Sequence, residues 1–158
     1  MLLNIGEKIP ELTLPDQNGT EHNLQNLLGE NGAVIYFYPK DNTPGCTLEA
    51  NDFEQLGDEF AKLGFKVIGI SKDSVKSHMN FSTKHALKFT LLSDQELKLC
   101  TAFGVWQEKK NYGKTYMGIV RSTFVVDGKG QVLTNYGKVK TKGHAQLVLD
   151  NILELTGS

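Results

Sequence analysis

The stretch YPKDNTPGCTLEAND, residues 38–52, holds the local signals that decide the fold. It follows the run AVIYFY (33–38), whose apolar, β-branched and aromatic residues predict a strand buried on both faces. Pro44 and Gly45 then predict a rigid turn, because proline fixes φ and glycine lets backbone approach backbone. This turn delivers Cys46 to the first turn of a predicted helix.

The residues after Cys46 carry a helical pattern. Phe53, Leu56, Phe60 and Leu63 recur at spacings of 3, 4 and 3. This periodicity predicts one amphipathic helix with a buried face, which ends at Gly64.

The rest of the chain supplies a β-hairpin before this region and alternating elements after it. The predicted elements are a hairpin of ELTLPD (11–16) and EHNL (21–24), a buried strand KVIGISK (66–72), a helix starting near Asp73 or Ser74, a capping box at Ser93–Glu96 opening a short helix through Phe103, a hairpin of STFVVD (122–127) and QVLTNYG (131–137), and a helix from about Gly143 to Leu155. This order predicts a single α/β domain over residues 1–158, with a mixed central sheet flanked by helices and an N-terminal β-hairpin. It is compatible with a thioredoxin-like fold.

Composition restricts the classes of function. The formal net charge of −1 gives no reason to expect a nucleic-acid or membrane partner, and the lysine-rich segments 108–114 and 137–144 are interpreted as solvated loops. We expect no signal peptide and no membrane-spanning run. Two cysteines do not form a disulfide framework, so we expect a cytoplasmic, reducing environment. No long uncovered apolar face is evident, which favours a monomer.

For Cys46 to be a reactive thiolate, neighbouring groups must lower the pKa of its thiol. A free thiol with a pKa of about 8.5 is only ~3% ionised at pH 7, so making it mostly thiolate requires about 3–4 kcal/mol. A helix N-terminus typically supplies only about 0.3–1 kcal/mol. A hydroxyl and a cation must therefore contribute. Thr43 can supply the hydroxyl from the same turn, and the cation is expected to be Arg121, the single arginine among 17 basic residues.

These residues lead to a family resemblance. Pro39, Thr43 and Cys46 match the P-x-x-x-T/S-x-x-C pattern of peroxiredoxins, and FYPKDNTPGCTLEA closely resembles the branch called bacterioferritin comigratory protein or peroxiredoxin Q. The similarity continues through LLSD (91–94), FGVW (103–106) and GIVRSTFVVD (118–127), so it covers nearly the whole chain.

The resemblance implies a thioredoxin fold and a thiol peroxidase that reduces hydrogen peroxide or organic hydroperoxides without a metal or other cofactor. It implies that Cys46 is the peroxidatic cysteine, that Thr43 hydrogen-bonds the thiolate and the peroxide, and that Arg121 stabilises both the thiolate and the transition state. Pro39 would shield the sulfur, and Glu49 would orient Arg121. Pro44 and Gly45 would support the site by setting the turn.

This chain lacks a resolving cysteine at the position where related proteins often carry one. Many members of this branch carry a resolving cysteine five residues after the peroxidatic one, where this chain has Asn51. Residues five apart on a helix have Cα atoms about 8.6 Å apart, beyond the ~7 Å limit for a disulfide, so such a pair would need local unwinding. Cys100 is interpreted as a small core residue on a short helix, with a resolving role as the alternative. We therefore predict a one-cysteine cycle reset by thioredoxin, glutaredoxin or glutathione.

Other functions fit the sequence less well. A thiol–disulfide oxidoreductase normally uses C-x-x-C, but the third residue after Cys46 is Glu49. A redox sensor or binding module on the same fold would need the same reactive thiol and stays open as an alternative. The four histidines show no metal-ligand spacing, and Trp106 is interpreted as a packing residue.

Overall fold

The central sheet is built around the apolar run that precedes Cys46. In the computed structural model, which describes residues 1–157, this run forms β3 (Gly32–Phe37), and all of its residues are buried. β3 pairs in parallel with β4 (Phe65–Ser71) and antiparallel with β8 (Ser122–Asp127). A strand with neighbours on both edges and helices on both faces must be apolar throughout, as the sequence predicts.

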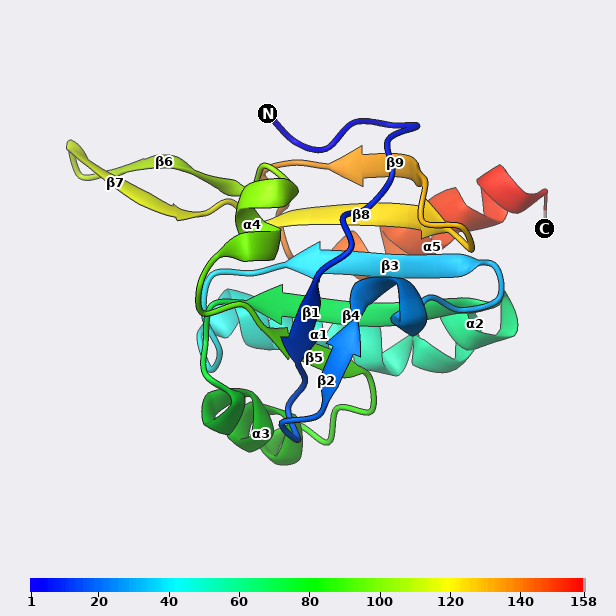
Figure 1. The fold of residues 1–158 in the computed structure, drawn as a ribbon, viewed down its shortest axis with the longest axis horizontal. Helices are drawn as coiled ribbons and strands as arrows, with labels where there is room; N and C mark the ends of the chain where they lie inside the picture. Colours follow the sequence, from blue (N-terminus) through cyan, green and yellow to red (C-terminus); the bar gives the residue numbers. More distant parts are fainter. Residues whose placement is uncertain (158) are drawn as a thin grey trace.

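The sheet is mixed, and its strand order is β5-β4-β3-β8-β9 (Figure 1). β4 and β5 run parallel, whereas β8 and β9 form an antiparallel hairpin. A separate two-stranded hairpin, β1 and β2, lies across the sheet near the N-terminus, as predicted. The remaining elements are β1 (Thr13–Pro15), β2 (Glu21–Asn23), η1 (Leu24–Leu27), α1 (Pro44–Gln55), α2 (Gly57–Lys62), α3 (Val75–Lys84), β5 (Thr90–Ser93), α4 (Lys98–Ala102), β6 (Trp106–Asn111), β7 (Lys114–Ile119), β9 (Val132–Tyr136) and α5 (His144–Thr156).

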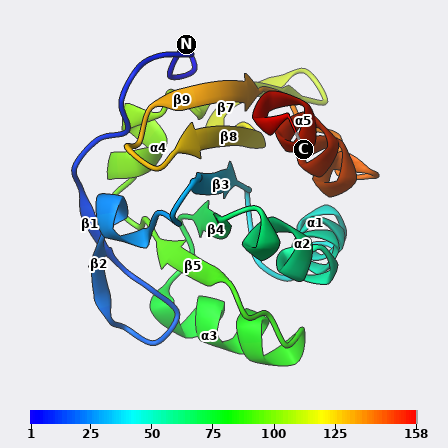
Figure 2. The same cartoon turned by 90° about the vertical axis from the view of Figure 1, so that its right-hand side faces the viewer.

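Alternate residues of β3 supply two separate cores. Ala33, Ile35 and Phe37 pack with η1 and α4 on one face of the sheet. Val34 and Tyr36 pack with α1, α2, α3 and α5 on the other. Figure 2 shows α4 and the N-terminal hairpin on one side of the sheet, with α1, α2 and α5 on the opposite side. These layers confirm the predicted α/β class and place α1 and α4 on different faces. Within the described residues, no helix is long and apolar enough to cross a membrane.

The helix predicted across residues 53–63 is wrong as a single element. α1 ends at Gln55, and α2 starts at Gly57 after a junction at Leu56 with φ −93° and ψ 3°. Glycine is among the poorest residues for a helix interior, so a break before Gly57 has little cost. Phe53 and Phe60 still point into the same core.

The predicted capping box is also wrong. Ser93 is the last residue of β5, and its hydroxyl donates to the Asp73 carbonyl at 2.6 Å. The carboxylate of Asp94 takes the capping role, because it accepts a hydrogen bond from the Cys100 N–H at 2.8 Å. α4 starts only at Lys98, after Leu97 in a left-handed conformation.

The lysine-rich segment 108–114 is not the loop that the sequence suggests. It forms the outer half of a β-ribbon, β6–β7, which projects from the body of the protein (Figure 1). Tyr112 and Gly113, both with positive φ, make its two-residue turn, which suits the twist of an antiparallel hairpin. Trp106 begins the ribbon and packs against the core as predicted. The second lysine-rich segment remains a loop up to α5.

Candidate active site

Cys46 is the third residue of α1 and lies where the chain leaves β3. Pro44 occupies the start of the helix, where its missing N–H costs no hydrogen bond. The Cys46 side chain packs in the core beneath α1 and is only 1% exposed. Its position near the helix N-terminus places it beside unpaired backbone N–H groups and the positive end of the helix dipole.

Arg121 reaches this sulfur from a segment 75 residues further along the chain, between β7 and β8. Its Nη2 donates to Cys46 Sγ at 3.2 Å, and its Nη1 donates to Glu49 Oε1 at 2.7 Å. Glu49 is fully buried one turn further along α1. One guanidinium therefore spans the thiol and the carboxylate, and the carboxylate fixes the orientation of the fork.

For both Arg121 and Glu49, burial and ion pairing shift the pKa in opposite directions. Burial lowers the pKa of Arg121, but Glu49 and Cys46 outweigh it, so that the pKa lies above its usual value. For Glu49, burial dominates over the pairing with Arg121 and raises its pKa to about 7. Its Oε2 atom has no hydrogen-bond partner among the described residues, which agrees with a carboxylate that is poorly solvated.

Thr43 stands immediately before α1, and its hydroxyl hydrogen is used in a bond to the backbone. Its Oγ1 donates to the Lys40 carbonyl at 2.8 Å. The Thr43 oxygen could accept a hydrogen bond from a bound peroxide in this arrangement. It could donate to the peroxide or to the thiolate only after giving up its bond to Lys40.

The remaining predicted residues shape the turn. Pro39 is half-buried two residues after the end of β3, and Pro44 is exposed at the helix start. A side chain at Gly45 would meet Arg121 Nη2 at 3.4 Å and Thr141 Cγ2 at 3.8 Å. These are ordinary van der Waals separations, so a methyl group at position 45 would also fit beside the guanidinium.

Lys109 is a basic residue in the electrostatic surroundings of the site that the sequence interpretation missed. It lies on β6, is half-buried, and its Nζ donates to the Ile119 carbonyl at 3.0 Å. Burial lowers its pKa and the charge of Arg121 adds to that effect, while Cys46 partly opposes it. The ribbon therefore brings a second cation towards the thiol. No sequence signal predicts the position of Lys109, because its lysine-rich segment has the composition of a solvated loop.

The second cysteine lies apart from this site. Cys100 is fully buried in α4, in the core on the opposite face of the sheet from Cys46. Burial raises its pKa strongly, and the neighbouring Asp94 carboxylate adds to the effect. Both cysteines are free thiols.

One cluster contains the residue types that bind metal ions. Ligand atoms of Asp41, Asp73 and His78 all lie within 4.8 Å of one another. However, Asp41 Oδ2 and His78 Nδ1 already share a hydrogen bond of 2.7 Å. A cation would have to break this bond.

The buried Glu49 leads to a prediction about pH. An acid whose pKa is raised by folding stabilises the protein fully below its usual pKa, here 4.5, and this contribution is lost as pH rises through about 7. Glutamine does not titrate, so the Glu49→Gln variant does not lose this contribution to stability as the pH rises. Its free energy of unfolding relative to the wild type should therefore rise by about 3 kcal/mol between pH 4.5 and pH 7.

Urea unfolding at several pH values measures this difference. His144, whose pKa burial lowers to about 4, has the opposite pH dependence, but it is present in both proteins and cancels. A difference in unfolding free energy that stays flat across this pH range would show that Glu49 does not titrate there.

Comparisons with known proteins identify the class. Residues 5–134 match the AhpC/TSA family. The chain is 46% identical over 156 residues to a peroxiredoxin Bcp of Bacillus subtilis, covering 99% of each chain. A solved structure of the Xanthomonas campestris bacterioferritin comigratory protein superposes with a TM-score of 0.89 at 45% identity, covering 98% of this chain and 100% of the other. A Xylella fastidiosa PrxQ structure gives a TM-score of 0.91 at 36% identity, covering 98% of each chain.

The chain therefore belongs to the AhpC/TSA family and is a peroxiredoxin, an enzyme that reduces peroxides with a cysteine thiol. Within that class it is of the Bcp/PrxQ type, with the thioredoxin-like fold that the sequence predicted.

Proposed function

We propose that this peroxiredoxin reduces alkyl hydroperoxides and hydrogen peroxide at Cys46, and that an external thiol resets it in a one-cysteine cycle. The Xanthomonas campestris relative is described for its alkyl peroxide reduction activity, which supports the first class of substrate. The observation that carries the assignment of Cys46 is its 3.2 Å contact with Arg121 at the start of α1.

In the proposed oxidation, the Cys46 thiolate attacks the nearer peroxide oxygen. The S–O bond forms as the O–O bond breaks, and the departing oxygen takes up a proton to leave as an alcohol or water. Cys46 becomes a sulfenic acid. Negative charge moves from sulfur to the leaving oxygen, so the Arg121 fork, held by Glu49, stabilises both ends of the reaction. Thr43 would contact the peroxide, and Pro39, Pro44 and Gly45 would keep the site closed and rigid.

The proposed reset starts from the sulfenic acid. A first external thiol forms a mixed disulfide with Cys46 and releases water, and a second thiol then reduces that disulfide. Two features support this route. Asn51, half-buried on α1, occupies the position where many relatives have a resolving cysteine. Cys100 is separated from Cys46 by the central sheet, so a disulfide between them requires extensive opening.

Replacing Cys100 tests this cycle. We expect the Cys100→Ala variant to keep its steady-state turnover within about twofold of the wild type, because the variant only empties a small volume in the core. Turnover with alkyl hydroperoxide should be compared using thioredoxin, glutaredoxin and glutathione as reductants. If Cys100→Ala still reacts once with peroxide but cannot turn over with any of them, the two-cysteine alternative is correct.

A further inference from the structure

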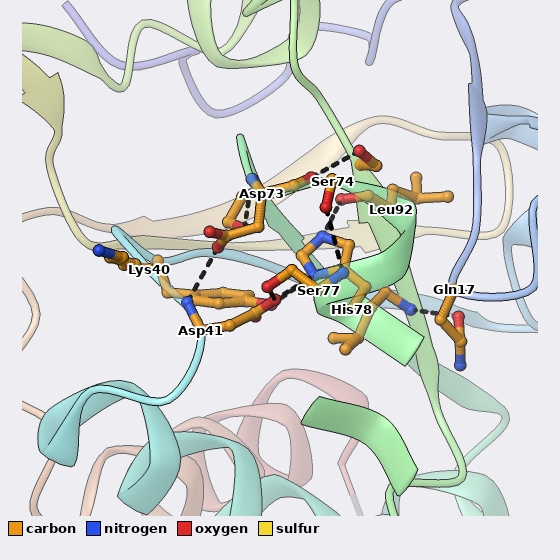
Figure 3. Close-up of polar contacts among 12 residues, drawn as sticks. Gln17, Lys40, Asp41, Asp73, Ser74, Ser77, His78 and Leu92 are labelled. Atoms are coloured by element: carbon orange, nitrogen blue, oxygen red, sulfur yellow. Dashed lines mark hydrogen bonds and ion pairs between the residues drawn. The ribbon is translucent and has the colours of Figure 1, made fainter. Parts of the chain in front are cut away.

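A buried network of polar side chains holds the loop that leads to Cys46. This loop, residues 38–43, connects β3 to α1. Figure 3 shows Asp41 of the loop beside Ser77 and His78 of α3. The carboxylate of Asp41 is buried and receives three hydrogen bonds. Tyr38 Oη donates to Oδ1 at 2.6 Å, Ser77 Oγ donates to Oδ2 at 2.8 Å, and His78 Nδ1 lies 2.7 Å from Oδ2. Two of these three partners come from α3, so the loop is fastened to that helix.

The surroundings of His78 define the charges of the pair. His78 is fully buried, and its Nε2 lies 3.0 Å from the Leu92 carbonyl, which can only accept. Its Nδ1 faces the Asp41 carboxylate, which is also an acceptor. Burial raises the pKa of Asp41, but the hydrogen bonds and charge of His78 outweigh it, so that the pKa lies below its usual value. An imidazolium that donates from both nitrogens to a carboxylate and a carbonyl satisfies every partner.

The backbone of the same residue is also tied down. The Asp41 N–H donates to Asp73 Oδ2 at 2.9 Å, and this oxygen also accepts a hydrogen bond from Ser71 Oγ at 2.6 Å. The next residue, Asn42, has a φ of 62°, in the left-handed region. Such a backbone persists when its neighbours hold it firmly. Asp41 therefore anchors a strained turn that ends directly at the start of α1.

We propose that His78 and Asp41 are positioning residues for the peroxidase reaction. Their ion pair holds the 38–43 loop, and through it Thr43 and the first turn of α1, in the arrangement that sets Cys46 against Arg121. Neither residue has to touch the peroxide to affect its reduction, because a displacement of about 1 Å in a reacting group can slow a reaction by about 10²-fold. The proposal rests on Cys46 being the thiol that reacts with peroxide.

A double-mutant cycle tests the proposal. The second-order rate constant for oxidation of Cys46 by hydrogen peroxide is measured by rapid quench and alkylation for His78→Gln, Asp41→Asn and the double variant. The measurements are made at a temperature where circular dichroism shows every protein folded. We expect each single variant to lower the rate constant by about 10-fold, and the double variant to lower it no further, because both changes break one interaction. Amide hydrogen exchange of residues 40–43, the part of the loop after Pro39, should rise while that of α5 does not change.

A matched control exists in the N-terminal hairpin. His22 Nε2 lies 2.7 Å from Asp16 Oδ2, the same separation as in the buried pair, but on the opposite side of the sheet from Cys46. The His22→Gln variant should keep the wild-type rate constant. If His78→Gln or Asp41→Asn does not stay folded, Ser77→Ala is the alternative variant, because it removes only one hydrogen bond to Asp41. It should lower the rate constant about twofold to threefold.

Unchanged rate constants in the folded His78→Gln and Asp41→Asn variants, or in Ser77→Ala, would overturn the proposal. Purely additive losses in the double variant would overturn it as well, because they would show that the two residues act separately. Failure of the proposed function has a different signature, since wild-type Cys46 would then react with peroxide no faster than a free cysteine.

Discussion

Arg121→Met should lower the second-order rate constant for oxidation of Cys46 by peroxide by about 10²–10³-fold, equivalent to about 2.7–4 kcal/mol of transition-state stabilisation. Arg121 Nη2 is the cationic donor that contacts the sulfur, at 3.2 Å, and its fork is fixed in place by buried Glu49. Methionine keeps much of the side-chain volume but removes both the charge and the donors. Stopped-flow or rapid-quench kinetics on the reduced protein measures the change directly.

Arg121→Lys should also be slow, because one ammonium cannot span the sulfur and the carboxylate as the planar fork does. A loss of about 10-fold or more is expected for this variant. Since removal of Arg121 leaves Glu49 buried without its partner, the Arg121→Met/Glu49→Gln double variant is the control. It should be more stable than Arg121→Met but equally slow. Rate constants within threefold of the wild type in both single variants would remove Arg121 from the mechanism.

Cys46→Ser should abolish peroxidase turnover. A serine hydroxyl at this position is not ionised at neutral pH and is a poor nucleophile towards peroxide. The change is nearly isosteric, and the hydroxyl can still accept a hydrogen bond from Arg121, so we expect the fold and its unfolding midpoint to change little. Coupled turnover assays with alkyl hydroperoxide, alongside circular dichroism, measure both quantities.

The other thiol should not rescue this variant. Cys100 is fully buried, and burial raises its pKa, so that at neutral pH it is neither accessible nor ionised. Turnover of Cys46→Ser above the rate of the reductant alone would mean that Cys100 reduces peroxide, contrary to the role proposed for Cys46.

The main strands of the fold could be predicted because their signals are local and strong. The runs at residues 33–38 and 66–72 are apolar throughout, which fits strands covered on both faces. The β6–β7 ribbon was missed because it is mostly exposed and carries no alternating pattern of buried residues. The sequence pattern does not reveal the break before Gly57, because the apolar spacing continues across it. Only the helical backbone is interrupted there.

The candidate site was predictable to the extent that its residues are close in sequence or rare. Cys46, Thr43 and Glu49 lie within one turn-and-helix segment, so the sequence alone predicts that they are close together. Arg121 is predicted as their partner because it is the single arginine of the chain. The pairing of Asp41 with His78 joins residues 37 positions apart, and the approach of Lys109 depends on the ribbon. Such contacts follow from how the elements pack, which no local spacing encodes.

The most direct test of the proposed cycle is the fate of both thiols after a single oxidation. The reduced protein is treated with one equivalent of alkyl hydroperoxide, with and without dimedone, and is digested without reductant for mass spectrometry. We expect a dimedone adduct on Cys46, which reports its sulfenic acid, and an unmodified thiol at Cys100 in both samples. A peptide joining Cys46 to Cys100 that accounts for the oxidised protein in the sample without dimedone would contradict the one-cysteine cycle.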